Sequence, residues 1–567
     1  MLYNTNPDKR PQSLLSGFYY LCNRLWDFGK RANGCESWNG FVFGSTEQLQ
    51  ANQITMKKNW LLYYKLHRWP GLILSFFLLY FGITGIFLNH RETFSGVDVR
   101  RQALPNAYHY DNWNNAAIKG QLNLGGDSLL LYGSIGIWLS DTAFSRYEDF
   151  NRGLPQGSDP RRVFDMHRCD RGHLYAATLF GLYAYDREQQ RWLPFDLEVD
   201  IKRFVGIETV GDTLYAINRS HLFRGLSAGP ATQFRKMELQ ATPDYQQRVS
   251  LMKTIWQIHS GEIFGLPGQL FVDALGLVTI FLSLTGIVWF FFPDWIKRRR
   301  RAGKPRRKLM LINTWSLRWH NKVGAWTFVL LAVLYFTGIF LRPPFLIAIA
   351  RSEVPPLPYT HLDQPNPWYD KLRDLLYDVE RDRMLVSTLD GMFWLDRQSK
   401  ALHKYENQPP ISVMGINVFE TYDGGAYLIG SFSGLFLWHP AHPEIWNFAQ
   451  GKVHVDHSGG RPVGDYKVTG ALRDAAGRRY MVDYDQGVLP LWHEEGFPAM
   501  PENILESSGI SLWNVSLEIH TGRFFSFLLS DFYILIVPLA GLAGVMVVIS
   551  GYILYRRKYR KRKKATR

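Results

Sequence analysis

The sequence predicts an integral membrane protein, a four-helix transmembrane bundle from a duplicated helix-loop-helix unit, plus an external all-β domain built from two long loops. Three observations predict this fold class. Four uncharged apolar stretches are each about long enough to cross a bilayer. The pentapeptide Thr-Gly-Ile-Phe-Leu begins at Thr84 and again at Thr337, each time 17 residues after a histidine. Both long loops contain short aromatic and β-branched runs between turn residues.

The four apolar stretches cover residues 70–88, 275–292, 323–341 and 532–555. Inside lipid, a single segment satisfies its own backbone hydrogen bonds only as a helix. We therefore expect four transmembrane helices within residues 56–90, 259–296, 320–343 and 520–555.

The formal net charge of +15 is concentrated in two places. Residues 297–308 and 556–567 hold nine basic residues each, and the rest of the chain carries a net charge of −3. This distribution does not indicate nucleic-acid binding, because each basic run directly follows an apolar stretch. The positive-inside rule places both termini, the connection 297–319 and the tail 556–567 in the cytoplasm. We expect a multi-pass protein of the bacterial inner membrane with periplasmic loops.

Residues 1–55 contain no apolar segment typical of a cleavable signal peptide. They are either an amino-terminal extension or the result of a start codon assigned upstream of Met56, which opens a natural-looking Met-Lys-Lys start. The three cysteines, Cys22, Cys35 and Cys169, form no C-x-x-C or C-x-x-C-H motif. A zinc knuckle and a covalently attached haem are therefore not expected.

The loops 91–258 and 344–519 repeat a pattern of strand, glycine turn and strand. The internal glycines fall 45 residues apart in the first loop and 43 and 53 apart in the second, at Gly136, Gly181, Gly391, Gly434 and Gly487. This period is close to that of propeller blades. Three units from each loop predict one shared propeller of about six blades, and the alternative is two separate small β domains.

Five histidines stand at the ends of the predicted spans. His67 and His320 lie at the inner ends of the first and third spans, and His90 lies at the outer end of the first. His259 and His520 precede the second and fourth spans in matching Ile-His-[Ser/Thr]-Gly motifs. The 23 residues from His67 to His90 correspond to about 34 Å of helix, so one haem cannot bridge them. The spacing predicts two haem sites, one near each face of the membrane.

These motifs resemble those of the PepSY-associated transmembrane proteins. The resemblance rests on the run Lys-Leu-His-Arg-Trp-Pro-Gly at 65–71, on Thr84-Gly85 with Leu-Asn-His at 88–90, and on the two Ile-His-[Ser/Thr]-Gly motifs. It implies an inner-membrane ferric-siderophore reductase that binds b-type haem, with two haems expected. The loops depart from the family pattern, because propeller-like units replace a recognisable PepSY module.

The resemblance implies that His67 and His320 bind the inner haem iron, and that His90, His259 and His520 compete for the outer one. Repeat symmetry favours His259 with His520. His90 has no counterpart, because Arg342-Pro343 replaces Asn89-His90 in the second half. It is then either a ligand of a further haem or a relay of protons or electrons.

Two functions follow as alternatives. In the first, the protein transfers electrons across the membrane to a periplasmic acceptor, either a ferric siderophore or other ferric chelate or a periplasmic protein. The cytoplasmic connection is too short for a flavin or nicotinamide domain, so the donor is membrane quinol or a separate reductase. In the second, the chain is a non-enzymatic, membrane-anchored propeller that senses or binds a periplasmic partner.

Overall fold

The computed structural model describes residues 46–397, 399–455 and 463–565. The expectation of an amino-terminal extension falls mainly on residues 1–45, outside the described residues. The chain divides into two compact units, Met1–Leu62 and Tyr63–Arg567, and the fold and site described below belong to the second.

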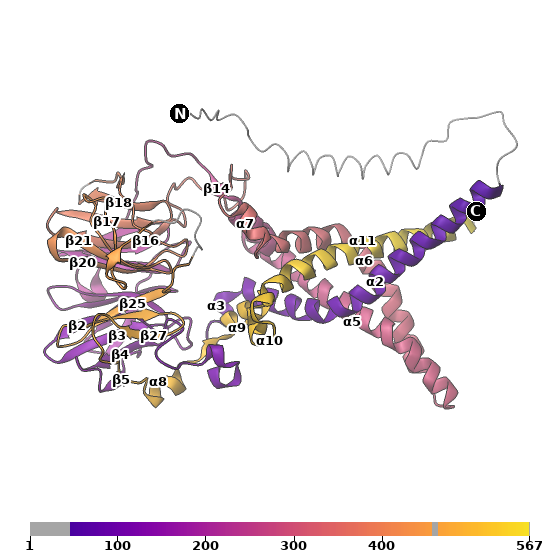
Figure 1. Cartoon of the computed structure of the whole chain (residues 1–567), viewed down its shortest axis with the longest axis horizontal. Coiled ribbons are helices and arrows are strands. Elements are labelled where there is room, and N and C mark those ends of the chain that lie inside the picture. Colours follow the sequence, from indigo (N-terminus) through magenta and orange to yellow (C-terminus); the bar gives the residue numbers. More distant parts are fainter. Residues whose placement is uncertain (1–45, 398, 456–462, 566–567) are drawn as a thin grey trace. The chain divides into compact units, whose positions relative to one another are not determined.

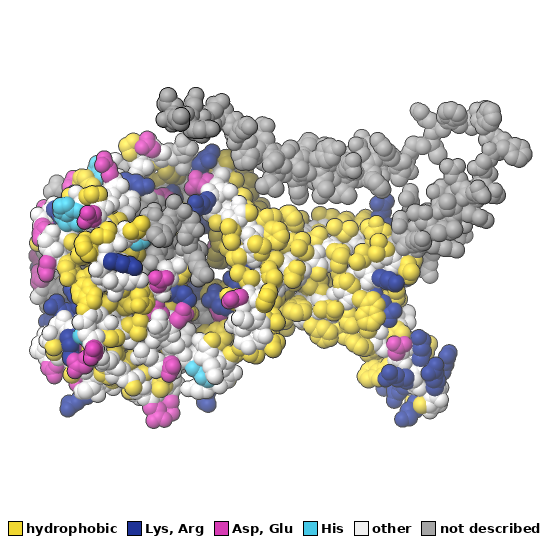
Figure 2. Space-filling view, viewed as in Figure 1, with side chains coloured by type: hydrophobic (Ala, Val, Ile, Leu, Met, Phe, Trp, Pro, Cys, Tyr) yellow, Lys and Arg dark blue, Asp and Glu magenta, His cyan; other side chains and the backbone are white. Residues whose placement is uncertain are grey.

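Four long helices cover the predicted spans wholly or for the most part: α2 (Thr46–Asn89), α5 (Gly265–Arg301), α6 (Arg307–Ile339) and α11 (Ile536–Ala565). The third span ends two residues earlier than predicted, and residues 532–535 of the fourth are 3-10 helix. All four are long and apolar enough to cross a membrane, as expected. At most 22% of the most apolar stretch of any of them is buried within the protein. Their exposed surface is mainly hydrophobic, whereas mixed charges cover the β domain (Figure 2). The long helices therefore present an apolar surface suited to lipid.

The loops also contain helices, where the sequence predicted strands alone. The helices are α3 (Arg91–Phe94), α4 (Leu251–Ser260), α7 (Phe345–Ile349), α8 (Glu502–Ser507) and α9 (Leu512–His520), and α10 (Ser526–Leu529) precedes α11.

The Ile-His-[Ser/Thr]-Gly motifs end α4 and α9 and do not begin a transmembrane helix. The cause is a left-handed glycine after each, Gly261 (φ 81°) and Gly522 (φ 78°), which terminates the short helix. A Cβ on Gly261 would lie 2.1 Å from the carbonyl oxygen of Gly268, so only glycine fits there.

Six antiparallel sheets form the β domain, three from each loop (Figure 1). The first loop supplies β2 (Ile118–Gly125) to β5 (Tyr147–Asp149), β6 (Val163–Arg168) to β9 (Arg191–Pro194), and β10 (Phe204–Val210) to β13 (Phe234–Met237). The second loop supplies β16 (Leu372–Asp378) to β19 (His403–Lys404), β20 (Ile416–Tyr422) to β24 (Lys452–Val453), and β25 (Val468–Arg473) to β27 (Gly487–Pro490).

The first strands of the six sheets contact one another in the cyclic order β2, β6, β10, β16, β20, β25 and back to β2. The β domain is thus one closed propeller of six blades, as the glycine spacing predicted. All five glycines used for that prediction begin the third strand of a blade. Each inner strand also has a β-bulge at its second residue, namely Lys119, Phe164, Val205, Arg373, Asn417 and Thr469. The bulges occupy equivalent positions around the ring.

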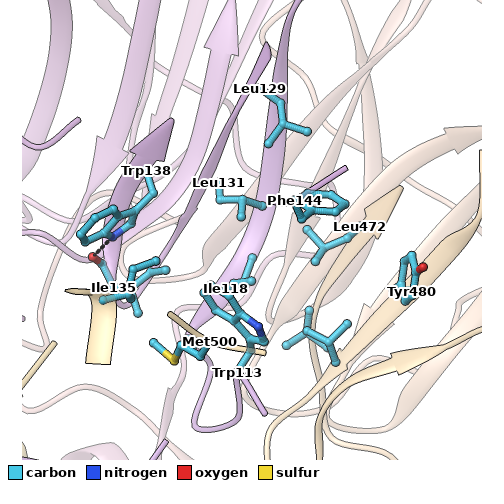
Figure 3. Packing of buried hydrophobic residues seen from close by; sticks show 14 residues of the cluster. Trp113, Ile118, Leu129, Leu131, Ile135, Trp138, Phe144, Leu472, Tyr480 and Met500 are labelled. Atoms are coloured by element: carbon cyan, nitrogen blue, oxygen red, sulfur yellow. Dashed lines mark hydrogen bonds between the residues drawn. The ribbon is translucent and has the colours of Figure 1, made fainter. Parts of the chain in front are cut away.

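Two hydrophobic seams join the loops. At the first, Leu129 and Leu131 of the first blade pack with Leu472 and Val482 of the last in one buried cluster (Figure 3). At the second, a cluster around Trp368 joins the third blade to the fourth. Two short sheets also cross between halves, β1 (Asp98–Val99) with β28 (Ile510–Ser511) and β14 (Val249–Ser250) with β15 (Glu353–Val354). Neither loop can therefore complete the ring alone.

We expect Leu472→Ala to destabilise the propeller, because it opens a cavity in the seam that closes the ring. Leu472 is 3% exposed, and truncating such a leucine costs about 2–5 kcal/mol. Leu226→Ala is the control, since Leu226 is 70% exposed, and it should change stability by less than about 0.5 kcal/mol. Denaturant unfolding of the detergent-solubilised protein measures both. Equal stabilities for the two variants would contradict a packed seam.

Candidate functional site

Two pairs of histidines face each other within the helical part of the protein. His67 on α2 and His320 on α6 have ring centroids 6.1 Å apart, with their planes at 73°. His259 at the end of α4 and His520 at the end of α9 have centroids 6.3 Å apart, with planes at 66°. The structure thus brings together four of the five histidines predicted from the sequence. They form an inner pair and an outer pair of nearly the same geometry.

The Nδ1 atom of each histidine is held by a neighbouring helix. His67 Nδ1 lies 2.9 Å from the carbonyl oxygen of Val547, and His259 Nδ1 lies 3.0 Å from that of Leu334. In the other two histidines, the partner of Nδ1 is a threonine hydroxyl oxygen instead of a carbonyl oxygen. His320 Nδ1 lies 3.0 Å from Thr285 Oγ1, and His520 Nδ1 lies 2.9 Å from Thr84 Oγ1.

These contacts determine which ring nitrogen carries the proton. A carbonyl oxygen can only accept, so Nδ1 of His67 and of His259 must donate. The hydroxyl of Thr84 donates to the Tyr80 carbonyl at 2.6 Å, and that of Thr285 donates to the Phe281 carbonyl at 2.8 Å. Each hydroxyl therefore accepts its second hydrogen bond from a histidine Nδ1–H. In their neutral form, all four histidines leave Nε2 unprotonated, and among the described residues no hydrogen bond reaches these atoms.

A glycine next to each hydroxyl residue makes room for the ring. A Cβ added to Gly551 would lie 2.7 Å from His67 Cε1, and one added to Gly338 would lie 3.0 Å from His259 Cε1. The corresponding distances are 3.4 Å for Gly286 to His320 and 3.5 Å for Gly85 to His520. Other glycines, such as Gly82, lie against neighbouring helices instead. Helix glycines therefore make room for the histidine rings at some positions and for close contact between helices at others.

The Thr-Gly and Ser-Gly pairs are functional residues that the sequence reasoning did not assign. They occur once in each long helix, at 84–85, 285–286, 337–338 and 550–551. Each faces a histidine from the opposite half of the chain: His67 contacts α11, His320 contacts α5, His259 contacts α6, and His520 contacts α2. The repetition of a small hydroxyl residue before glycine was the available signal. Its partner could not be identified without the fold.

His90 does not join the outer pair. Its Nε2 lies 2.6 Å from Asp273 Oδ2, and the neighbouring Asn89 donates to Asp273 Oδ1 at 2.8 Å. The expectation that His90 competes for the outer position therefore has no support in the geometry. A carboxylate on α5 holds this histidine instead.

The geometry of the pairs fits a metal held between two imidazoles. Two imidazoles bound trans to one metal at about 2 Å per nitrogen have centroids about 6 Å apart, because each centroid lies about 1 Å behind its nitrogen. Metal-binding histidines also donate their second N–H to a carbonyl or a similar acceptor. Around the inner pair, a cavity is lined by several glycines: Gly71, Gly286, Gly324, Gly544 and Gly551. These glycines reduce the side-chain bulk in the lining of the cavity.

The family model described as the PepSY-associated TM region matches this chain twice, over residues 13–292 and 287–558. The chain belongs to the PepSY-associated TM family. The two matches coincide with the two halves of the PepSY-associated bundle and so confirm the duplication inferred from the sequence. A search of curated proteins gave no match.

Several solved structures are distantly similar to this PepSY-associated chain. One is described as the extracellular domain of a hybrid two component system, BT4673, from B. thetaiotaomicron, at 13% identity and a TM-score of 0.30, covering 68% of this chain and 40% of that one. Others are the Mitotic Checkpoint Complex (8%, TM-score 0.29, coverage 70% and 95%) and the N-terminal domain of Nup159 (8%, TM-score 0.27, coverage 64% and 72%). This chain spans less than half the length of the first. These similarities are too low to assign a function.

We expect Gly551→Ala to destabilise the bundle, because the new methyl group would meet His67 at 2.7 Å. Overpacking of this kind costs about 1–3 kcal/mol. Gly71→Ala is the matched control, since its Cβ would meet only Val547 Cγ1, at an ordinary 3.6 Å. Thermal unfolding in detergent compares the two. A Gly551→Ala protein as stable as Gly71→Ala would show that His67 does not occupy this position.

Proposed function

We propose that the protein binds two b-type haems and transfers electrons across the bacterial inner membrane to a ferric chelate in the periplasm. His67 and His320 would hold the inner haem, and His259 and His520 the outer one. The observation that carries the proposal is the repeated pair geometry. The imidazoles of the two pairs have ring centroids 6.1 Å and 6.3 Å apart, and each Nδ1 is hydrogen-bonded whereas no described residue hydrogen-bonds an Nε2.

The distance between the two histidine pairs supports electron transfer along the bundle. His520 bonds Thr84, which lies 17 residues after His67 on α2, a rise of about 26 Å. One haem cannot reach both pairs. Two haems at these positions would lie near opposite ends of a helix long enough to cross the bilayer.

The chemistry follows from the ligand set. Bis-histidine haem iron has no open coordination position and exchanges single electrons without binding substrate. The protein residues would fix each imidazole through its Nδ1–H, leave Nε2 available, and surround the site with apolar helix surface. A ferric chelate is a suitable acceptor, because one electron converts Fe³⁺ to Fe²⁺, which hard oxygen ligands hold far less tightly.

Electrons would enter from the cytoplasmic side or from the membrane. The described connection between α5 and α6 covers only residues 302–306, so this segment contains no cofactor domain. Membrane quinol or a separate reductase would therefore donate. The basic residues at the end of α5 support a cytoplasmic position for this connection and for both termini, with the propeller in the periplasm.

Single histidine substitutions test the haem assignment. We expect His67→Ala and His320→Ala each to remove one haem, His259→Ala and His520→Ala each to remove the other, and His90→Ala to leave both. The reduced-minus-oxidised spectrum and the haem-to-protein ratio of purified, iron-replete protein provide the measurement. A wild-type protein without a b-haem spectrum would refute the proposal and favour the anchored sensor or binding module.

Thr84→Val tests the hydrogen bond that orients His520. The valine keeps the shape of the side chain but leaves the Nδ1–H without its hydroxyl acceptor, and loss of such a partner typically weakens metal affinity about 10–100-fold. We expect the outer haem to bind correspondingly more weakly while the inner haem is unchanged. Thr314→Val is the control, because Thr314 is exposed and bonds only the carbonyl of its own helix. Unchanged haem retention in Thr84→Val would separate this residue from the site.

A further inference from the structure

A group of cations lies at one end of the ring of inner strands of the propeller. Arg162 and Arg203 directly precede the inner strands β6 and β10, and Lys119 and Arg373 are the bulge residues near the start of β2 and β16. These four inner strands are consecutive in the ring. All four basic residues lie at the starts of equivalent strands and therefore at the same end of the ring. Together they are called the basic mouth.

Three of these cations surround one aromatic ring. The Cζ atoms of Arg203 and Arg162 lie 4.2 Å and 5.5 Å from the ring centroid of Phe164, and Lys119 Nζ lies 5.6 Å from it. Phe164 is the bulge residue of β6 and is 7% exposed. Cations are attracted to an aromatic face, but each also repels the other two. The ring alone does not neutralise three charges.

The three cations lack direct anionic partners. Among the described residues, no side-chain hydrogen bond or ion pair reaches Lys119, Arg162 or Arg203, and the fully buried Nε of Arg203 has no acceptor. Other arginines of the same region are paired, such as Arg91 with Asp159 and Arg219 with Asp370. Burial lowers the pKa of Arg203, and the neighbouring arginines lower it further. Enclosed charges of this kind normally have a partner.

The nearest carboxyl groups compensate only in part. Asp374 and Asp165 attract Lys119 at longer range. Burial raises the pKa of Asp374 to about 8, which largely neutralises it near neutral pH, whereas the pKa of Asp165 rises only to about 6. Asp159 attracts Arg162 at longer range, and burial lowers the pKa of Lys119. Among the described residues, no carboxylate pairs directly with the three cations, so the basic mouth keeps positive charge that a bound anion could meet.

We propose that the basic mouth binds a small organic polycarboxylate anion, with Arg162, Arg203 and Lys119 holding its carboxylate oxygens. The planar guanidinium groups match carboxylates in bidentate geometry, and several cations that converge on one point favour a ligand with several carboxylates. Convergence within a ring of strands favours a compact ligand over a polymer or a membrane surface, because those would need cations spread along an open face.

The basic mouth lies at the end of the propeller that is tied to the outer histidine pair. Asp159, three residues before Arg162, accepts hydrogen bonds from Arg91 after α2 and from Asn514 on α9, at 2.8 Å and 3.0 Å. His520 lies six residues beyond Asn514, about 9 Å along α9. A ferric polycarboxylate bound here would therefore stand close to the proposed outer haem. Its role as electron acceptor rests on the proposed function, whereas the binding itself does not.

Calorimetric titration of the full-length protein in detergent with citrate, ferric citrate and inorganic phosphate tests the site. We expect citrate and ferric citrate to bind, and phosphate to bind at least tenfold more weakly. Arg203→Gln should weaken citrate binding at least tenfold, and Arg203→Lys should restore part of it. Arg235→Gln changes the net charge equally at an exposed position on β13 (Phe234–Met237) and should alter binding less than twofold.

Thermal unfolding shows whether the variants are folded. Without ligand, Arg203→Gln should be at least as stable as the wild type, because the substitution relieves repulsion, and citrate should raise only the wild-type melting temperature. Failure of the wild type to bind citrate, or equal losses in Arg203→Gln and Arg235→Gln, would overturn the proposal. Phosphate binding as tight as citrate would refute the polycarboxylate class.

Titration of the His259→Ala/His520→Ala double variant separates the two proposals. Citrate binding that persists in this variant supports the basic mouth whatever the result for haem. A wild-type protein that contains haem but does not bind citrate would overturn the basic mouth alone.

Discussion

The hydrogen bonds between each histidine and the opposite half of the chain are the interactions on which the arrangement depends. His67 and His259 belong to the first half and bond carbonyl oxygens of α11 and α6 in the second. His320 and His520 belong to the second half and bond hydroxyls of α5 and α2 in the first. Each half therefore provides both the imidazoles and the acceptors that orient the other half's imidazoles. Neither half can form an oriented pair alone.

The propeller, which lies outside the spans, also needs both halves of the chain. Each loop forms three blades, and an open half-ring would expose two apolar faces, one at the seam around Leu472 and one at the seam around Trp368. Closing the ring buries both faces and also brings together the outer ends of the helices through β1 with β28 and β14 with β15. The bundle and the propeller are thus stabilised in the same way. In both, the contacting surfaces come from different halves of the chain.

The sequence predicts those features that depend on local pattern. Length and apolarity identify the four spans, and regularly spaced glycines such as Gly136 and Gly391 identify the blades. It does not predict contacts between distant residues. The contact of His90 with Asp273 joins residues 183 positions apart, and the pairing of His259 with His520 joins residues still further apart. The breaks at Gly261 and Gly522 were missed because a glycine just before an apolar run fits a continuing helix as well as a helix end. The basic mouth was missed because Lys119, Arg162 and Arg203 lie some 40 residues apart in the sequence and meet only when blades assemble.

The two halves differ on the outer side of the bundle and in the propeller. Both pairs of histidines obey the repeat, but Asn89 and His90 bind Asp273, whereas Arg342 at the equivalent position lies 5.9 Å from the ring of Tyr533. The basic mouth is asymmetric too, since its cations come from the first four blades only. Two identical subunits would present every residue twice and could not form such a one-sided site. Fusing the copies into one chain lets the frame of paired histidines stay symmetric while the propeller diverges between its two halves.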